Sequence, residues 1–134
     1  MAARAVTALY DEHLADSGLT AAQLTVLWCV VASEPVAMGD IGRFVAMDKS
    51  TVTRNVAALV ALGFLRVGKG TDARHRLVSS TARGRGAFER AMPAWRAAQA
   101  AAARLIGTRR LDALTRQSYR AARAVVRADE KEVA

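Results

Sequence analysis

Hydrogen-bond donors are concentrated directly after Asp48, a residue type that can cap a helix by accepting a bond from an early backbone N–H. The donor residues are Lys49, Ser50, Thr51, Thr53, Arg54 and Asn55. Donors at the start of a helix reach base edges and phosphates when that helix lies in the major groove of duplex DNA. Arg54 suits guanine and Asn55 suits adenine. Ser50 and Thr51 can donate to phosphate, and helix capping is their alternative role.

A second cluster of cations lies in a glycine-bearing loop between two β-rich segments, residues 64–67 and 76–80. This pattern predicts a hairpin, or wing. Its basic residues are Lys69, Arg74, His75 and Arg76. An arginine on such a loop can enter an adjacent minor groove, and we expect Arg74 to do so. Asp72 would repel phosphates, so we expect it to pair with Arg74 or Arg76 and fix the loop.

Helical periodicity predicts the elements that position these clusters. The expected helices are 3–16, 20–34, 38–45, 49–62, 82–105 and 109–128, with a fraying tail after residue 128. The expected apolar stripes are Met38, Ile41, Phe44 and Val45 in the third helix, and Val52, Val56, Leu59, Val60 and Leu62 in the fourth.

Thr20 and Gln23 form a capping-box pattern, Gly63 and Thr81 are placed as caps, and Pro93 should bend the long helix. The element order predicts a mainly α winged helix-turn-helix with a small β-hairpin wing.

Charge and composition favour a polyanionic partner. The 134 residues carry a net charge of +8. Residues 1–60 hold four basic and six acidic residues, a net of −2, whereas residues 61–134 hold sixteen and six, a net of +10. Apolar residues are abundant, but much of their share is alanine, which adds little core volume, so extra burial in a dimer is expected. The one cysteine forms no intramolecular disulfide, and we expect a cytoplasmic protein without a signal peptide or a membrane span.

The run from Met47 to Glu89 resembles the MarR family of bacterial transcription regulators. The most specific parts are residues 48–55, the Asp72-Ala73-Arg74 signature and residues 80–84. The resemblance implies a single domain over residues 1–134. Its winged helix-turn-helix lobe covers about 20–80, and its dimerisation helices cover about 3–16 and 82–128. It also implies a homodimer that binds a palindromic operator with half-sites about one helical turn apart and acts as a repressor.

Relatives with this pattern often release DNA when a small aromatic or anionic effector binds between the dimerisation helices and the DNA-binding lobe. The residues expected to line such a place are Tyr10, His13, Trp28, Met38, Met92 and Trp95, and ordinary core or interface packing is their alternative role. Thiol-based redox sensing through Cys29 is another alternative. Cys29 lies in an apolar run, where burial raises the thiol pKa and blocks access, so we expect it to be inert.

Other function classes are less well supported. An enzyme would draw on His13 with Asp16, or on His75 near Ser79 and Ser80, but we expect His75 to lack an orienting carboxylate. The two histidines and one cysteine have no recognised metal-ligand spacing, Asp11-Glu12-His13 is only a weak signal, and no metal or cofactor is expected. A winged-helix module that docks an acidic protein remains the main competitor to DNA binding. Such docking favours exposed apolar anchors, whereas we expect Val52 and Val56 to be buried.

Overall fold

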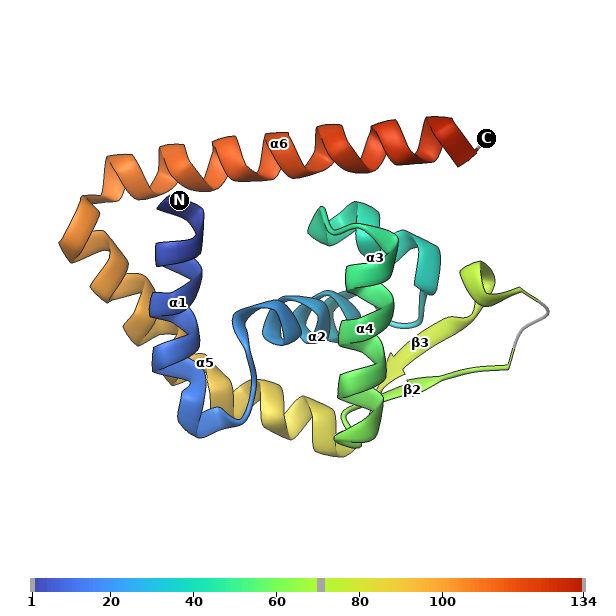
Figure 1. Ribbon diagram of the computed structural model, residues 1–134. Coiled ribbons are helices and arrows are strands. Elements are labelled where there is room, and N and C mark those ends of the chain that lie inside the picture. The colour runs from blue at the N-terminus through green and yellow to red at the C-terminus, as the bar shows by residue number, and fades with distance from the viewer. Residues whose placement is uncertain (1, 70–71, 134) are drawn as a thin grey trace.

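The fold is a helical frame with a small antiparallel sheet that projects from one side, as the computed structural model of residues 2–69 and 72–133 describes it (Figure 1). The elements are α1 (Ala2–Leu14), a 3-10 turn η1 (Ala15–Ser17), α2 (Ala21–Ser33), β1 (Val36–Ala37), α3 (Met38–Val45), α4 (Lys49–Ala61), β2 (Leu65–Val67), a 3-10 turn η2 (Ala73–His75), β3 (Leu77–Ser80), α5 (Ala82–Ile106) and α6 (Thr108–Val133). The tip of the predicted wing, Gly70 and Thr71, lies outside the described residues.

The predicted hairpin is confirmed, but its sheet has a third strand that the sequence did not indicate. β3 lies in the middle, with β2 and β1 antiparallel on either side. Val36 pairs with Val78, and Leu65 pairs with Ser80. β1 has only two residues, too few for an alternating pattern to appear in the sequence.

The core is centred on α2, whose buried residues are Leu24, Val26, Leu27 and Val30. α3, α4, the sheet and the first half of α5 pack around this helix. α1 packs along α5, whose buried residues are all small: Gly84, Ala87, Ala91, Ala98, Ala101 and Ala102. Small side chains allow two helices to approach closely but bury little apolar area each. α5 is one continuous helix that includes Pro93 and curves between its yellow start and its orange end (Figure 1).

The predicted caps are confirmed because each depends on residues close in sequence. Thr20 and Gln23 form both bonds of the capping box, at 3.0 and 3.1 Å. Gly63 adopts a left-handed φ of +78° after α4, and the next amide, Phe64 N, donates to the carbonyl of Leu59 at 2.9 Å. This pairing is a Schellman motif, which satisfies carbonyls at the end of a helix. Thr81 caps α5 by accepting from Gly84 N at 2.9 Å.

Three residues assigned to apolar stripes are exposed, so this part of the prediction is wrong. Phe44 is 58% exposed, Val60 40% and Leu62 39%. α3 and α4 therefore cover the core with a stripe narrower than their sequences allow, although Val45 and Leu59 in their last turns still pack on the core. The final helix also continues to Val133 instead of ending near residue 128. Its last residues include strong helix formers and no glycine or proline.

Candidate nucleic-acid interface

The start of α4 is organised by the carboxylate of Asp48. Its Oδ1 accepts from the backbone N–H of Thr51 and from Ser50 Oγ, each at 2.8 Å, and its Oδ2 accepts from Thr51 Oγ1 at 2.8 Å. These bonds, first of all the one from the Thr51 amide, lower the pKa of Asp48 from 3.8 to about 2. The charged cap therefore persists in mild acid.

The six predicted donors of α4 differ in how far they are engaged within the protein. Ser50 and Thr51 donate their hydroxyl protons to Asp48, which is the capping alternative. Thr53 Oγ1 donates to the carbonyl of Lys49, and Asn55 Nδ2 to that of Thr51, both at 2.8 Å.

Lys49 and Arg54 remain on the exposed surface of the same helix start. Neither side chain has a hydrogen bond or an ion pair within the described part of the chain. These two cations are therefore the side chains of α4 best placed to contact an external anion, and a base or a phosphate would each provide one.

In the wing, Asp72 organises the turn through a different pairing from the one expected. Its Oδ1 accepts from the backbone N–H of Arg74 at 3.0 Å, and its Oδ2 lies 3.1 Å from His75 Nδ1. The amide of Arg74 is the main reason that the pKa of Asp72 is lowered. The expected partners, the guanidinium groups of Arg74 and Arg76, are not the ones used.

This pairing also corrects the expectation that His75 lacks an orienting carboxylate, since Asp72 provides one. The pair is nonetheless open to solvent, with 74% of the His75 side chain and 57% of the Asp72 side chain exposed. Lys69, Arg74 and Arg76 are also exposed. The wing thus presents its cations to solvent on a turn held by an acidic residue.

The base of the wing is anchored by a polar cluster that the sequence analysis missed. Glu34, after α2, accepts from the backbone N–H of Ser80 at 2.9 Å and from the Ser80 hydroxyl. Arg85 of α5 approaches Glu34 at 3.6 Å and donates to Ser80 Oγ at 3.1 Å. The Ser80 hydroxyl is the main cause of a lowered pKa at Glu34. Glu34 and Ser80 are 46 residues apart, so no local pattern could have joined them.

The six predicted effector residues are distributed over separate environments. Trp28 makes edge-to-face contacts with Trp95 and Phe88, at centroid distances of 5.1 and 5.5 Å. Met38 and Met92 pack on the core as partly buried residues. His13 Nδ1 lies 2.9 Å from the Leu9 carbonyl, and the Tyr10 hydroxyl donates to Gln99. Packing or hydrogen bonding accounts for each of these side chains, and effector binding by them stays a prediction.

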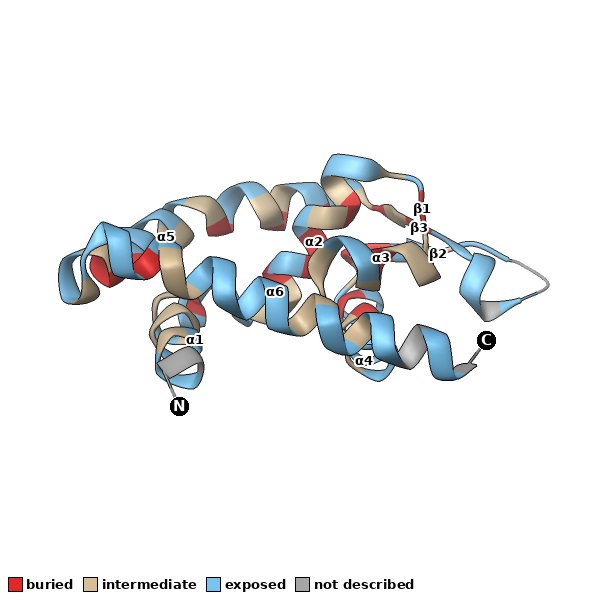
Figure 2. Cartoon of the chain, turned by 90° about the horizontal axis from the view of Figure 1, so that it is seen from above, coloured by how far each residue is buried: buried red, intermediate tan, exposed pale blue. Residues whose placement is uncertain are grey.

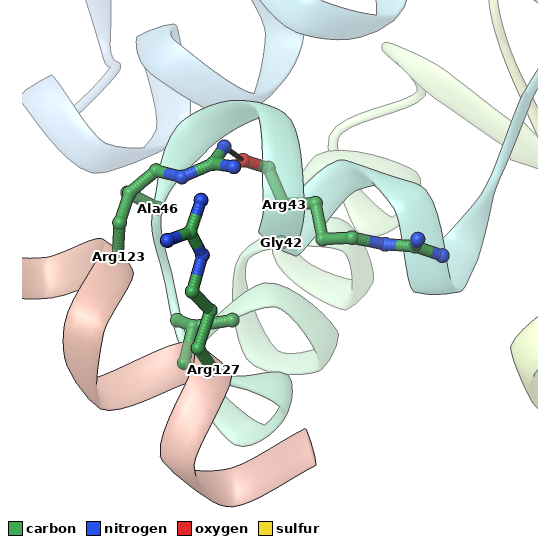
Figure 3. Close-up of a pocket in the computed structure, with 6 residues that line it drawn as sticks. Gly42, Arg43, Ala46, Arg123 and Arg127 are labelled. Carbon is green, nitrogen blue, oxygen red and sulfur yellow. Dashed lines mark hydrogen bonds between the residues drawn. The ribbon is translucent and has the colours of Figure 1, made fainter. Parts of the chain in front are cut away.

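A hollow of about 150 Å³ lies instead between α3 and α6, as Figure 3 shows. Its lining residues are Gly42, Arg43, Ala46, Arg123, Val126 and Arg127. Arg123 Nη1 donates to the backbone carbonyl of Arg43 at 2.7 Å, and the Arg127 side chain points toward Arg123 (Figure 3). The side chain of Arg43 points away, toward Asp40, with which it forms a 2.7 Å ion pair.

Cys29 is half-buried rather than fully enclosed, and burial raises the pKa of its thiol. A raised pKa leaves less of the reactive thiolate at neutral pH. This environment opposes the redox-sensing alternative, although the thiol is partly accessible.

Among residues 2–69 and 72–133, no group of three or more His, Cys, Asp or Glu side chains could hold a metal ion. In the same part of the chain no single helix is long and apolar enough to cross a membrane, and the one pair that passes together, Arg4–Ser17 with Ala21–Ser33, is bent by 72°.

The capped α4, preceded by α3 and followed by the β2–β3 wing, defines the winged helix-turn-helix class. A family model described as the MarR family matches residues 17–75. A crystal structure of the M. tuberculosis transcriptional regulator MosR in complex with DNA is similar to this chain, with 33% identity, 92% coverage of both chains and a TM-score of 0.77. The chain belongs to the MarR family of transcriptional regulators.

Two further relatives extend the comparison. The Bacillus subtilis (strain 168) protein YwoH, an uncharacterised HTH-type transcriptional regulator, is 30% identical over 79 residues, which are 59% of this chain and 58% of YwoH. The Bordetella bronchiseptica regulator BpsR, whose DNA binding is regulated by 6-hydroxynicotinic acid, is 25% identical over 89% of this chain and 86% of BpsR, with a TM-score of 0.74. These relatives are transcriptional regulators, which agrees with the expectation that the chain is not an enzyme.

Proposed function

We propose that this chain binds duplex DNA through the start of α4 and the wing, and that it acts in the cytoplasm. The observation that carries the proposal is the exposed Lys49 and Arg54 at a capped helix start, accompanied by a wing that also presents cations. Val52 and Val56 of the same helix are buried, so neither is available as an apolar anchor for docking to an acidic protein. The likeness to MosR, solved with DNA, supports the same reading.

We further propose that the active form is a homodimer built from α1, α5 and α6. Figure 2 shows α6 pale blue over most of its length, and Leu105 at the end of α5 is 73% exposed. Val125 and Tyr119 of α6 are also exposed apolar or aromatic side chains. A second copy would cover these residues. Its two-fold symmetry would place two α4 helices in successive major grooves.

A palindromic operator follows from this symmetry, with half-site centres about 10 bp apart or a multiple of that spacing. A dimer bound in this way covers a promoter and excludes other proteins from it, so repression is the regulatory outcome that we propose. Selection of bound duplexes from a random pool, followed by sequencing, tests the operator. An inverted repeat is expected, whereas enrichment of a single unrepeated site would contradict the symmetric dimer.

A small anionic effector is the last part of the proposal, and the hollow between α3 and α6 is the place we assign to it. Arg123 and Arg127 are one helical turn apart, where like charges repel, and an anion between them relieves that repulsion. A carboxylate can also compete with the Arg43 carbonyl for Arg123 and so loosen α6 from α3. BpsR responds to a carboxylic acid, which supports this class of ligand.

The effector site is tested with 6-hydroxynicotinic acid and inorganic phosphate as probes. A rise in melting temperature and a fall in DNA affinity are expected for the wild type and not for Arg127→Gln. Arg120→Gln, an exposed position on the same helix that does not line the hollow, is the matched control. An equal response of all three proteins would contradict the assigned place, and no response of the wild type to either probe would remove the support for the site.

A further inference from the structure

The turn η2 of the wing (Ala73–His75) lies against the first turn of α3. The N-cap of α3 is Ala37, whose methyl side chain cannot accept a hydrogen bond from the first amides of the helix. The backbone carbonyl of Arg76 takes over this role, since it accepts from Met38 N at 2.9 Å. The wing therefore caps α3, and the start of α3 supports the wing in return.

Gly39 makes this close approach possible. A Cβ atom at Gly39 would lie 2.7 Å from Arg74 Cγ and 3.3 Å from both Arg74 Nε and the Arg74 carbonyl oxygen. The closest of these atoms belongs to the root of the Arg74 side chain, and the carbonyl belongs to the turn itself. Rotation of the guanidinium alone moves neither atom, so a larger residue at 39 forces Arg74 into another rotamer or shifts the turn.

We propose that Gly39 is a positioning residue for DNA recognition. Because Gly39 has no side chain, the wing turn can pack directly against α3, and this contact fixes the position of Arg74 relative to α4. The inference rests on the proposed function. α3 packs against both α4 and the wing turn, so it connects the two DNA-contacting elements. A wing that is ordered before binding loses less conformational entropy when DNA binds.

Substitution of Gly39 by alanine tests the proposal, and Gly86→Ala is its matched control. Both positions are helical, so alanine raises helix propensity at each. A Cβ at Gly86 would lie against the guanidinium of Arg90, nearest to Nη1 at 3.1 Å, which is the mobile end of a long side chain. Gly39→Ala is expected to weaken operator binding about tenfold and to lower the slope of log affinity against log salt by about one, as for the loss of one DNA contact. Wild-type affinity and slope in Gly39→Ala would overturn the proposal.

A double-mutant cycle with Arg74→Ala separates positioning from a general loss of stability. Arg74→Ala removes the Cγ atom that a new Cβ at position 39 would strike. In that background Gly39→Ala is expected to lose less than twofold in affinity, because the contact that it disturbs is already absent. Fully additive losses would show that Gly39 does not act through Arg74.

Hydrogen exchange of the Met38 amide keeps the proposal testable if Gly39→Ala does not fold. The bond from Met38 N to the Arg76 carbonyl predicts slow exchange in the free wild-type protein. Exchange at the rate of an open loop would show that the wing turn is not seated on α3. A wild-type protein that binds no DNA would refute the proposed function instead, and the exchange of Met38 would still report on the seating.

Discussion

Replacement of Asp48 by alanine removes the cap of α4 and should lower the free energy of unfolding by about 1 kcal/mol. One backbone N–H and two hydroxyls lose their acceptor, but the start of α4 is exposed and water replaces most of what is lost. The stabilisation that remains is therefore that of an ordinary N-cap. In a chain of this length the same loss corresponds to a decrease of about 3 °C in melting temperature.

Urea denaturation of Asp48→Ala, Asp48→Asn and the wild type measures this effect. Asparagine keeps an oxygen that can accept from the Thr51 amide but lacks the charge and the second carboxylate oxygen, so Asp48→Asn should be less stable than the wild type and more stable than Asp48→Ala at pH 7. The pKa of Asp48 is lowered to about 2, so its carboxylate stabilises the folded state above pH 4 and loses that contribution as the pH falls toward 2. Asp48→Asn should lack this loss. Equal stability of Asp48→Ala and the wild type at pH 7 would refute the reasoning.

Three more substitutions or modifications have distinct expected outcomes. Gly84→Ala should cost about 3 kcal/mol in thermal unfolding, because its Cβ would overlap the backbone carbonyl of Phe64. Glu34→Ala should cost about 2 kcal/mol in urea unfolding, because the buried Ser80 loses its acceptor. The raised pKa of Cys29 should make its alkylation by iodoacetamide slower at pH 7 than that of a cysteine in an unfolded peptide, with the rate still rising above pH 9.

Each of these three predictions has an outcome that would contradict it. A stable Gly84→Ala protein would mean that α5 does not approach the residue before β2 as closely as the structure shows. An unchanged Glu34→Ala protein would mean that the polar cluster at the base of the wing adds no net stability. Fast alkylation of Cys29 at pH 7 would restore the redox-sensing alternative.

The parts of the fold that the sequence predicted are those determined by near neighbours. Asp48, Thr81 and the Thr20–Gln23 pair were recognised as caps because each acts on an amide within three residues. The order of helices followed from apolar periodicity, and Gly63 marked the end of α4. These features locate the candidate site in the chain. They do not determine which of its side chains are available.

The remaining features depend on contacts between distant segments. The polar cluster of Glu34 with Ser80, the seat of Arg74 on Gly39 and the bond from Arg123 to the Arg43 carbonyl all join elements far apart in sequence. The exposure of stripe residues such as Phe44 could not be predicted from the sequence either. Apolar periodicity gives the direction of a helix's apolar face but not the width of the part that is buried. Within the wing, the choice of His75 as partner of Asp72 depends on the geometry of the turn.

The most direct test of the account is fluorescence anisotropy of the purified protein with its own upstream intergenic DNA and with a scrambled duplex, at near-physiological salt. The account predicts tight binding that is selective for the upstream DNA, with two chains per operator, and a weaker preference for that DNA in Arg54→Ala. Weak binding without selectivity, on DNA shown to contain the true upstream region, would contradict the account.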